Sequence, residues 1–128
     1  GDHGSTYGGN PLCCAAAQAV LGTLTEEPIM QQAGHIRDAL LAALRSHIAD
    51  PALIAEVRGR GLMIGIQPNT AIDHIVAQGL AKGLLLNIAG GDTIRVLPPL
   101  VMSTEQAGEL GQGIAGILNH VAQQEDRA

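Results

Sequence analysis

The sequence has 128 residues and a formal net charge of −5, which is the size of one folded domain and too short for a two-domain enzyme. Apolar residues make up 46% of the chain and charged residues 15%, a composition that buries a core and excludes intrinsic disorder. Seven basic residues, one aromatic residue and no run of about 18 apolar residues argue against a nucleic-acid partner and against a membrane span.

The first predicted element is a helix over residues 12–24. Asn10 can cap it, Pro11 suits its first position, and the run that follows is rich in alanine. The helix contains the only cysteines, Cys13 and Cys14; adjacent thiols make a strained disulfide, and two thiols cannot complete a zinc site. We expect them to be small buried thiols of the core.

An amphipathic helix is predicted over residues 29–48, where apolar side chains recur at steps of three and four until Asp50 and Pro51 end the pattern. Two short β-type runs follow at 54–58 and 62–66. The Gly59-Arg60-Gly61 segment between them suits a tight hairpin.

In the second half of the chain, a predicted helix is again followed by two short β-type runs. Residues 70–73 resemble a capping box that opens a helix to about Lys82, and strands are expected at 84–88 and 93–97. A second capping box, Ser103 to Gln106, opens the last helix. Helices at both ends with β pairs between them predict an α+β fold, a small and mostly antiparallel sheet covered on one face by helices.

Three features of the sequence could indicate a functional site, but a structural role explains each of them better. The segment Gly111-Gln112-Gly113-Ile114-Ala115-Gly116 has dinucleotide-binding spacing, but it lies inside a predicted helix, so its glycines are expected to allow close helix packing. Lys82, the only lysine, is expected to be a solvated helix end. The histidines are scattered, which predicts no metal site; they are His3, His35, His47, His74 and His120.

The glycine-rich opening segment has two open interpretations. Ser5 and Thr6 offer hydroxyl and amide donors beside glycines, and the helix that follows points its positive end at them, as in anion or phosphate sites. The alternative is a flexible connector capped by Asn10.

Arg95 is the other singular residue. It lies within an apolar strand just before Pro98 and Pro99, so a rigid element carries its guanidinium, which could hold a carboxylate in a bidentate fork. Strand alternation leaves open the alternative that Arg95 faces water.

Four blocks of the sequence cover nearly the whole chain in a particular order: His3-Gly4-Ser5-Thr6-Tyr7-Gly8-Gly9-Asn10-Pro11-Leu12, then Glu56-Val57-Arg58-Gly59-Arg60-Gly61-Leu62-Met63 with Gly65, then Gly83-Leu84-Leu85-Leu86-Asn87, and Ile94-Arg95-Val96-Leu97-Pro98-Pro99-Leu100. In this order and spacing the chain resembles the C-terminal part of class III, pyridoxal-phosphate-dependent aminotransferases. The resemblance is nearest to the acetylornithine type, with ornithine-type relatives close behind.

The resemblance implies part of a homodimeric fold-type I enzyme, and the chain's start without Met inside a loop agrees with a piece of a longer protein. Residues 1–24 would be the end of the large domain, with its phosphate-contact loop and bridging helix, and residues 25–128 the small C-terminal domain. The cofactor-binding lysine would lie upstream, so no catalytic residue is expected here and the isolated chain is predicted inactive. The sequence around Lys82 is similar to the sequence around the family's cofactor-binding lysine. Lys82 would lie in the small domain, however, so it is not expected to be that lysine.

The resemblance also implies site residues. Ser5 and Thr6 would contact the phosphate of pyridoxal 5'-phosphate in the partner subunit, and Arg95 would bind the substrate α-carboxylate. The implied reaction moves an amino group between N-acetylornithine and 2-oxoglutarate in arginine biosynthesis. With no secretory leader in the sequence, a cytoplasmic enzyme is expected. The alternative is an independent, non-catalytic binding or dimerisation module derived from the small domain.

Overall fold

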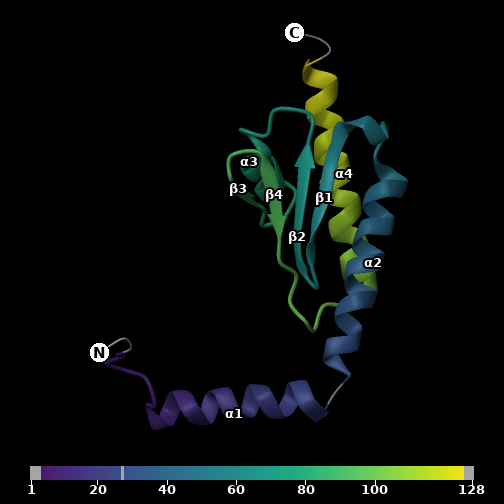
Figure 1. The fold of residues 1–128 in the computed structure, drawn as a ribbon. Helices are drawn as coiled ribbons and strands as arrows, with labels where there is room; N and C mark the ends of the chain where they lie inside the picture. Colours follow the sequence, from purple (N-terminus) through teal and green to yellow (C-terminus); the bar gives the residue numbers. More distant parts are fainter. Residues whose placement is uncertain (1–3, 27, 126–128) are drawn as a thin grey trace.

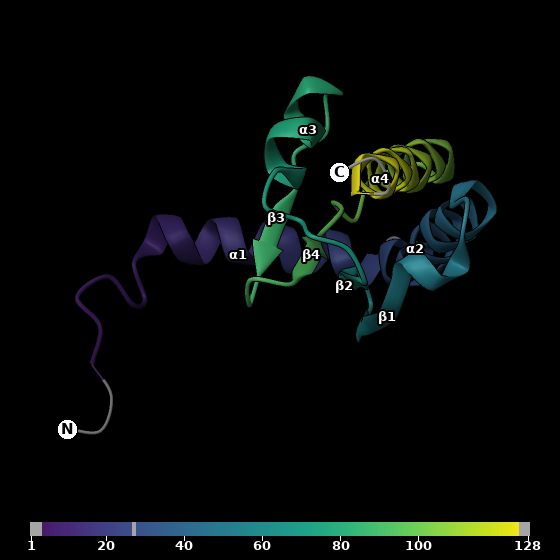
Figure 2. The ribbon, with the colours of Figure 1, turned by 90° about the horizontal axis from the view of Figure 1, so that it is seen from above.

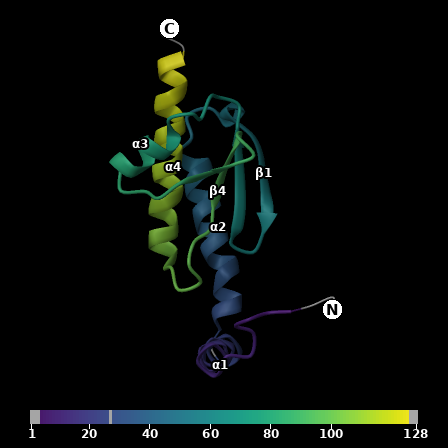
Figure 3. The same cartoon turned by 90° about the vertical axis from the view of Figure 1, so that its left-hand side faces the viewer.

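The computed structural model describes residues 4–26 and 28–125, which form a four-stranded antiparallel sheet with helices on one of its faces (Figures 1 and 3). The predicted α+β fold is confirmed. The elements in chain order are α1 (Pro11–Glu26), α2 (Ile29–His47), the 3₁₀ helix η1 (Pro51–Leu53), β1 (Ile54–Arg60), β2 (Met63–Pro68), α3 (Ile75–Ala81), β3 (Asn87–Ala89), β4 (Thr93–Val96) and α4 (Thr104–Glu125).

Helix α1 extends away from the sheet and from the other helices (Figures 1 and 2). Asn10 caps it as predicted, because its side-chain oxygen accepts hydrogen bonds from the backbone N–H groups of Leu12 at 3.0 Å and Cys13 at 3.3 Å. Both Cys13 and Cys14 are exposed, so the expectation of buried thiols was wrong. Alanine-rich sequence specifies the helix, but no other described element covers its length.

The amphipathic helix α2 forms as predicted and packs against α4 (Figure 3). Its apolar positions are buried, with Ile36, Leu40 and Leu44 fully inaccessible to solvent. The side chains of α2, α4 and the inner sheet face make one core, whose largest fully buried members are Ile36, Leu40, Leu44, Ile64, Ile66, Ile75, Ile94, Ile114, Ile117 and Leu118.

The glycines within α4 serve close packing, as the sequence analysis expected. A Cβ at Gly111 would collide with the carbonyl oxygen of Leu40 on α2, and a Cβ at Gly113 would lie 2.5 Å from the Leu84 side chain. The two helices therefore meet almost backbone to backbone at Gly111. Dinucleotide binding has no support at this place, since the segment neither follows a strand nor opens a helix.

The strands lie in the order β1-β2-β4-β3, and every neighbouring pair is antiparallel. Both predicted strand pairs are confirmed, although their ends differ from those expected. Strand β1 continues to Arg60, so the hairpin turns at Gly61 and Leu62, and β3 begins only at Asn87.

The two predicted capping boxes have different outcomes. Ser103 and Gln106 make both reciprocal bonds at the start of α4, from the Ser103 N–H to Gln106 Oε1 at 3.1 Å and from the Gln106 N–H to Ser103 Oγ at 3.2 Å. The box at residues 70–73 was wrong, because α3 begins at Ile75 and its preceding residue, His74, makes no side-chain cap bond. Gly83, with φ +76°, follows the end of α3 as expected.

Candidate anion site on the outer face of the sheet

Four residues lie in one row across the sheet, one from each strand. The strand pairing aligns Arg58 with Gly65, Gly65 with Arg95, and Arg95 with Asn87. Residues directly opposite each other in antiparallel strands point to the same face, so this row places two guanidinium-bearing side chains on one surface with a glycine between them.

The row lies on the face that points away from the helices. On β4, Ile94 and Val96 are buried in the core while Arg95, between them, is exposed. Arg95 therefore faces away from the core, which is compatible with both interpretations of this residue, a carboxylate-binding role and a side chain that simply faces water. The outward direction is also the one in which a ligand would approach, so the geometry is compatible with a carboxylate fork.

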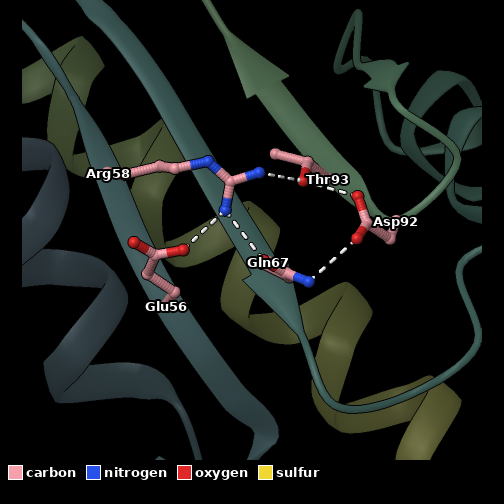
Figure 4. Close-up of polar contacts among 5 residues, drawn as sticks. All are labelled: Glu56, Arg58, Gln67, Asp92 and Thr93. Atoms are coloured by element: carbon pink, nitrogen blue, oxygen red, sulfur yellow. Dashed lines mark hydrogen bonds and ion pairs between the residues drawn. The ribbon is translucent and has the colours of Figure 1, made fainter.

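Arg58 is held in a closed ring of polar side chains on this face (Figure 4). Its guanidinium donates to Glu56 Oε2, to Gln67 Oε1 and to Thr93 Oγ1, each at 2.8 Å. Asp92 closes the ring, because one of its carboxylate oxygens accepts from the Thr93 hydroxyl and the other from the Gln67 amide, both at 2.8 Å. We call these five residues the Arg58 ring.

Arg95 is not part of the Arg58 ring. Throughout residues 4–26 and 28–125, no side chain or carbonyl makes a hydrogen bond or an ion pair with its guanidinium. It lines an open hollow of about 340 Å³ together with Arg58, Gly65, Asp92 and Met63. The hollow therefore offers one uncommitted guanidinium beside a second that is already neutralised.

Gly65 gives the Arg58 side chain its path across the sheet. A Cβ at this position would lie 3.1 Å from Cγ2 of Thr93 and 3.5 Å from Cγ of Arg58. These contacts are at or inside ordinary van der Waals distance, so the absence of a side chain allows Arg58 to reach over β2 to Thr93 on β4.

The other predicted site residues lie elsewhere. Ser5 and Thr6 are exposed and belong to the segment before α1, which lies away from the sheet (Figure 1). The Ser5 hydroxyl oxygen accepts a hydrogen bond from the Gly8 N–H at 2.9 Å, which leaves its own proton available to an acceptor. Within one chain, the structure does not bring these hydroxyls to Arg95. His3, the first residue of this block, lies outside the described residues.

Lys82 lies at a helix end, and the described histidines belong to no group of potential metal ligands. Lys82 is exposed at the end of α3, where its backbone N–H bonds to the Gly79 and Leu80 carbonyls, in agreement with a solvated helix end. In the part of the chain that the structure describes, no group of three His, Cys, Asp or Glu side chains could hold a metal ion. Nor does any helix there have the length and apolar character needed to cross a membrane.

The sequence analysis missed the Arg58 ring. Its members come from β1, β2 and the start of β4, and Arg58 is 35 residues from Thr93 in the chain. One signal was available: Val57 is the inward residue of β1, so strand alternation already placed Glu56 and Arg58 together on the outer face.

A family model described as aminotransferase class-III matches residues 1–118 of the chain. Ornithine aminotransferase 1 of Staphylococcus saprophyticus is 43% identical over 118 residues, which cover 92% of this chain and 29% of that protein. Acetylornithine aminotransferase 1 of Bordetella bronchiseptica is 40% identical over 110 residues, covering 86% of this chain and 28% of that protein.

Solved structures agree with the sequence relatives. Ornithine aminotransferase of Toxoplasma gondii superposes with a TM-score of 0.84 at 30% identity, over 97% of this chain and 30% of that one. Acetylornithine aminotransferase of Elizabethkingia anophelis gives a TM-score of 0.80 at 33% identity, over 94% and 31% respectively. The chain thus spans about 30% of the length of these relatives.

Proposed function

Because this chain belongs to the class-III aminotransferase family, whose members depend on pyridoxal 5'-phosphate, we propose that it is the C-terminal part of such an enzyme. Residues 1–24 would end the large domain and residues 25–128 would be the small domain. The separation of α1 from the sheet and the remaining helices supports this division (Figure 1). The chain's single lysine, Lys82, is on the surface at a helix end, so the chain alone is expected to be inactive.

The observation that carries the proposal is the state of Arg95. Its guanidinium lies on a rigid strand, faces outward into a hollow, and has no partner among the described side chains. A guanidinium in that state can bind a carboxylate through two parallel hydrogen bonds. We assign to Arg95 the α-carboxylate of each substrate, because amino acids and 2-oxo acids share this group.

Ser5 and Thr6 are the residues that would hold the cofactor phosphate. Both are exposed, the Ser5 hydroxyl retains its proton for an acceptor, and backbone N–H groups of the same segment lie beside them. This donor set fits a phosphate dianion. The cofactor supplies the chemistry that carries the amino nitrogen between substrates. Since the segment lies away from Arg95 in one chain, we propose that it serves the partner subunit of a homodimer.

The relatives' names guide the choice of substrate. Enzymes named for acetylornithine and for ornithine match the chain at similar identity, 40% and 43%. We propose N-acetylornithine as amino donor and 2-oxoglutarate as acceptor, in a cytoplasmic enzyme of arginine biosynthesis. Both compounds carry the α-carboxylate that Arg95 would bind.

The experiment is steady-state kinetics of the full-length protein with Arg95→Ala. We expect kcat/KM to fall at least about 100-fold for both substrates, because a charge-assisted fork contributes roughly 3 kcal/mol. Arg60→Ala is the matched control, an exposed arginine on the same sheet face that does not line the hollow. Unchanged kinetics of Arg95→Ala would remove its role.

A further inference from the structure

The two carboxylates of the Arg58 ring, those of Glu56 and Asp92, are both engaged within the ring. Glu56 pairs with Arg58 at 2.8 Å, and the Asp92 carboxylate accepts one hydrogen bond on each oxygen, from Thr93 and from Gln67. Asp92 lies three residues before Arg95 and lines the same hollow. Asp92 is the acidic residue in the lining of that hollow, so its carboxylate would compete there with an anion that Arg95 binds.

We propose that the Arg58 ring is a positioning device that keeps Asp92 from pairing with Arg95, so that the guanidinium of Arg95 stays available to a carboxylate ligand. This inference rests on the proposed function only in the identity of that ligand. Arg58 and Thr93 are thus positioning residues, since they act on the ligand through Arg95 and Asp92.

Thr93 is the link on which the ring depends. Its hydroxyl accepts from Arg58 and donates to Asp92, so it passes the orientation of one group to the other. Thr93 is also buried, two residues before Arg95 on the same short strand, whereas the side chains of Arg58 and Glu56 are 45% and 55% exposed. Removal of this one hydroxyl opens the ring and frees one oxygen of Asp92.

The test compares Thr93→Val with Thr93→Ser in the full-length protein. Valine keeps the shape and suits a strand but removes the hydroxyl, while serine keeps the hydroxyl. The first readout is the rate at which phenylglyoxal modifies Arg95, followed by peptide mass spectrometry, with Arg60 in the same sample as an internal reference. A guanidinium paired with a carboxylate reacts more slowly than a free one.

We expect Thr93→Val to slow modification of Arg95 about fivefold, the size of a partly exposed ion pair, and Thr93→Ser to leave the rate unchanged. Adding Asp92→Asn to Thr93→Val should restore the rate, because an amide does not neutralise Arg95. If Thr93 had a purely structural role, Asp92→Asn would not restore the modification rate of Arg95, because loss of a second ring member would disturb the site further.

Kinetics give the second readout. Thr93→Val should raise KM for N-acetylornithine and 2-oxoglutarate about fivefold with kcat nearly unchanged, and Asp92→Asn should reverse the increase. An equal modification rate in Thr93→Val and Thr93→Ser, or a slowed rate that Asp92→Asn does not restore, overturns the inference. If the modification rates behave as expected while Arg95→Ala leaves KM unchanged, the ring stands and the proposed substrate role of Arg95 falls.

Discussion

The Asn119 side chain donates a hydrogen bond to the carbonyl oxygen of His47, 72 residues away in the chain, at 2.9 Å. The same carboxamide accepts from the Ala49 backbone N–H, also at 2.9 Å. Asn119 on α4 therefore satisfies backbone groups at the end of α2, where a helix leaves its last carbonyls unpaired.

We expect Asn119→Ala to lower the free energy of unfolding of this chain by about 1–3 kcal/mol, because both backbone groups lose their partner. Chemical denaturation measures the change. Asn119→Asp keeps the acceptor for Ala49 but places a carboxylate oxygen against the His47 carbonyl at the C-terminus of α2, so at neutral pH its loss should be at least as large. Equal stability of wild type and Asn119→Ala would contradict the role given to this side chain.

Two glycines on α4 make a matched pair. Gly111→Ala places a methyl group against the Leu40 carbonyl and should destabilise the chain by about 1–3 kcal/mol through overpacking. A Cβ at Gly108 would have no neighbouring atom within 4 Å outside its own helix backbone. Gly108→Ala should therefore stabilise the helix by about 0.5–1 kcal/mol. Thermal unfolding of the two variants should shift the midpoint in opposite directions; shifts of the same sign would refute the close approach.

The hairpin that carries Arg58 contains a second matched pair. Gly59 has φ +126° and a Cβ there would collide with the Met63 carbonyl, so Gly59→Ala is expected to cost about 1–3 kcal/mol. Gly61 has φ +55° with open space around it, a conformation that asparagine adopts readily. Gly61→Asn should shift the denaturation midpoint by only a small fraction of the shift that Gly59→Ala causes.

Glu105 gives the start of α4 a pH dependence. A hydrogen bond from its own backbone N–H, aided by the Ser103 hydroxyl, lowers the pKa of its carboxyl below the ordinary value of 4.5. A lowered pKa in the folded state means that the stabilisation is complete above about pH 4.5 and disappears as the pH falls through the folded-state pKa. The advantage of wild type over Glu105→Gln should therefore be present at pH 6 and should shrink as the pH falls below the ordinary value of 4.5.

Denaturation curves at several pH values measure this advantage. Glu109→Gln removes a carboxylate from an exposed position of the same helix and controls for net charge. A difference between wild type and Glu105→Gln that stays constant from pH 6 to about pH 2 would contradict the assigned cause.

Local patterns were reliable where one face of an element is covered. The apolar steps of α2 and the capping box of Ser103 and Gln106 predicted both long helices, because periodicity and capping chemistry act over a few residues. The same reasoning misplaced the start of α3. There the Ile75 N–H bonds to the Ile72 carbonyl at 3.0 Å, a turn that satisfies the same pattern of residues as a first helical turn.

Other features depend on parts of the chain that a local pattern does not connect. An alanine-rich helix predicts burial of Cys13 and Cys14 only if another element covers them, and none of the elements within residues 4–26 and 28–125 does. Three bonds of the Arg58 ring join residues 9, 25 and 35 positions apart, which the register of three strands brings together. The burial of Ile94 and Val96 shows that Arg95 faces outward, but the sequence offers both a ligand role and a solvent-facing side chain for that direction.

The register between β2 and β4 determines both which residues are exposed on the outer face and which apolar residues are buried on the inner face. A slip of one residue would turn Arg95 toward the helices and leave Ile94 in water, so the sheet would lose apolar burial and gain an unsolvated cation. A misaligned sheet is therefore destabilised both by the exposed apolar side chain and by the buried charge. Packing of the apolar interior therefore also fixes the guanidinium on the outer face, where we propose that a carboxylate binds.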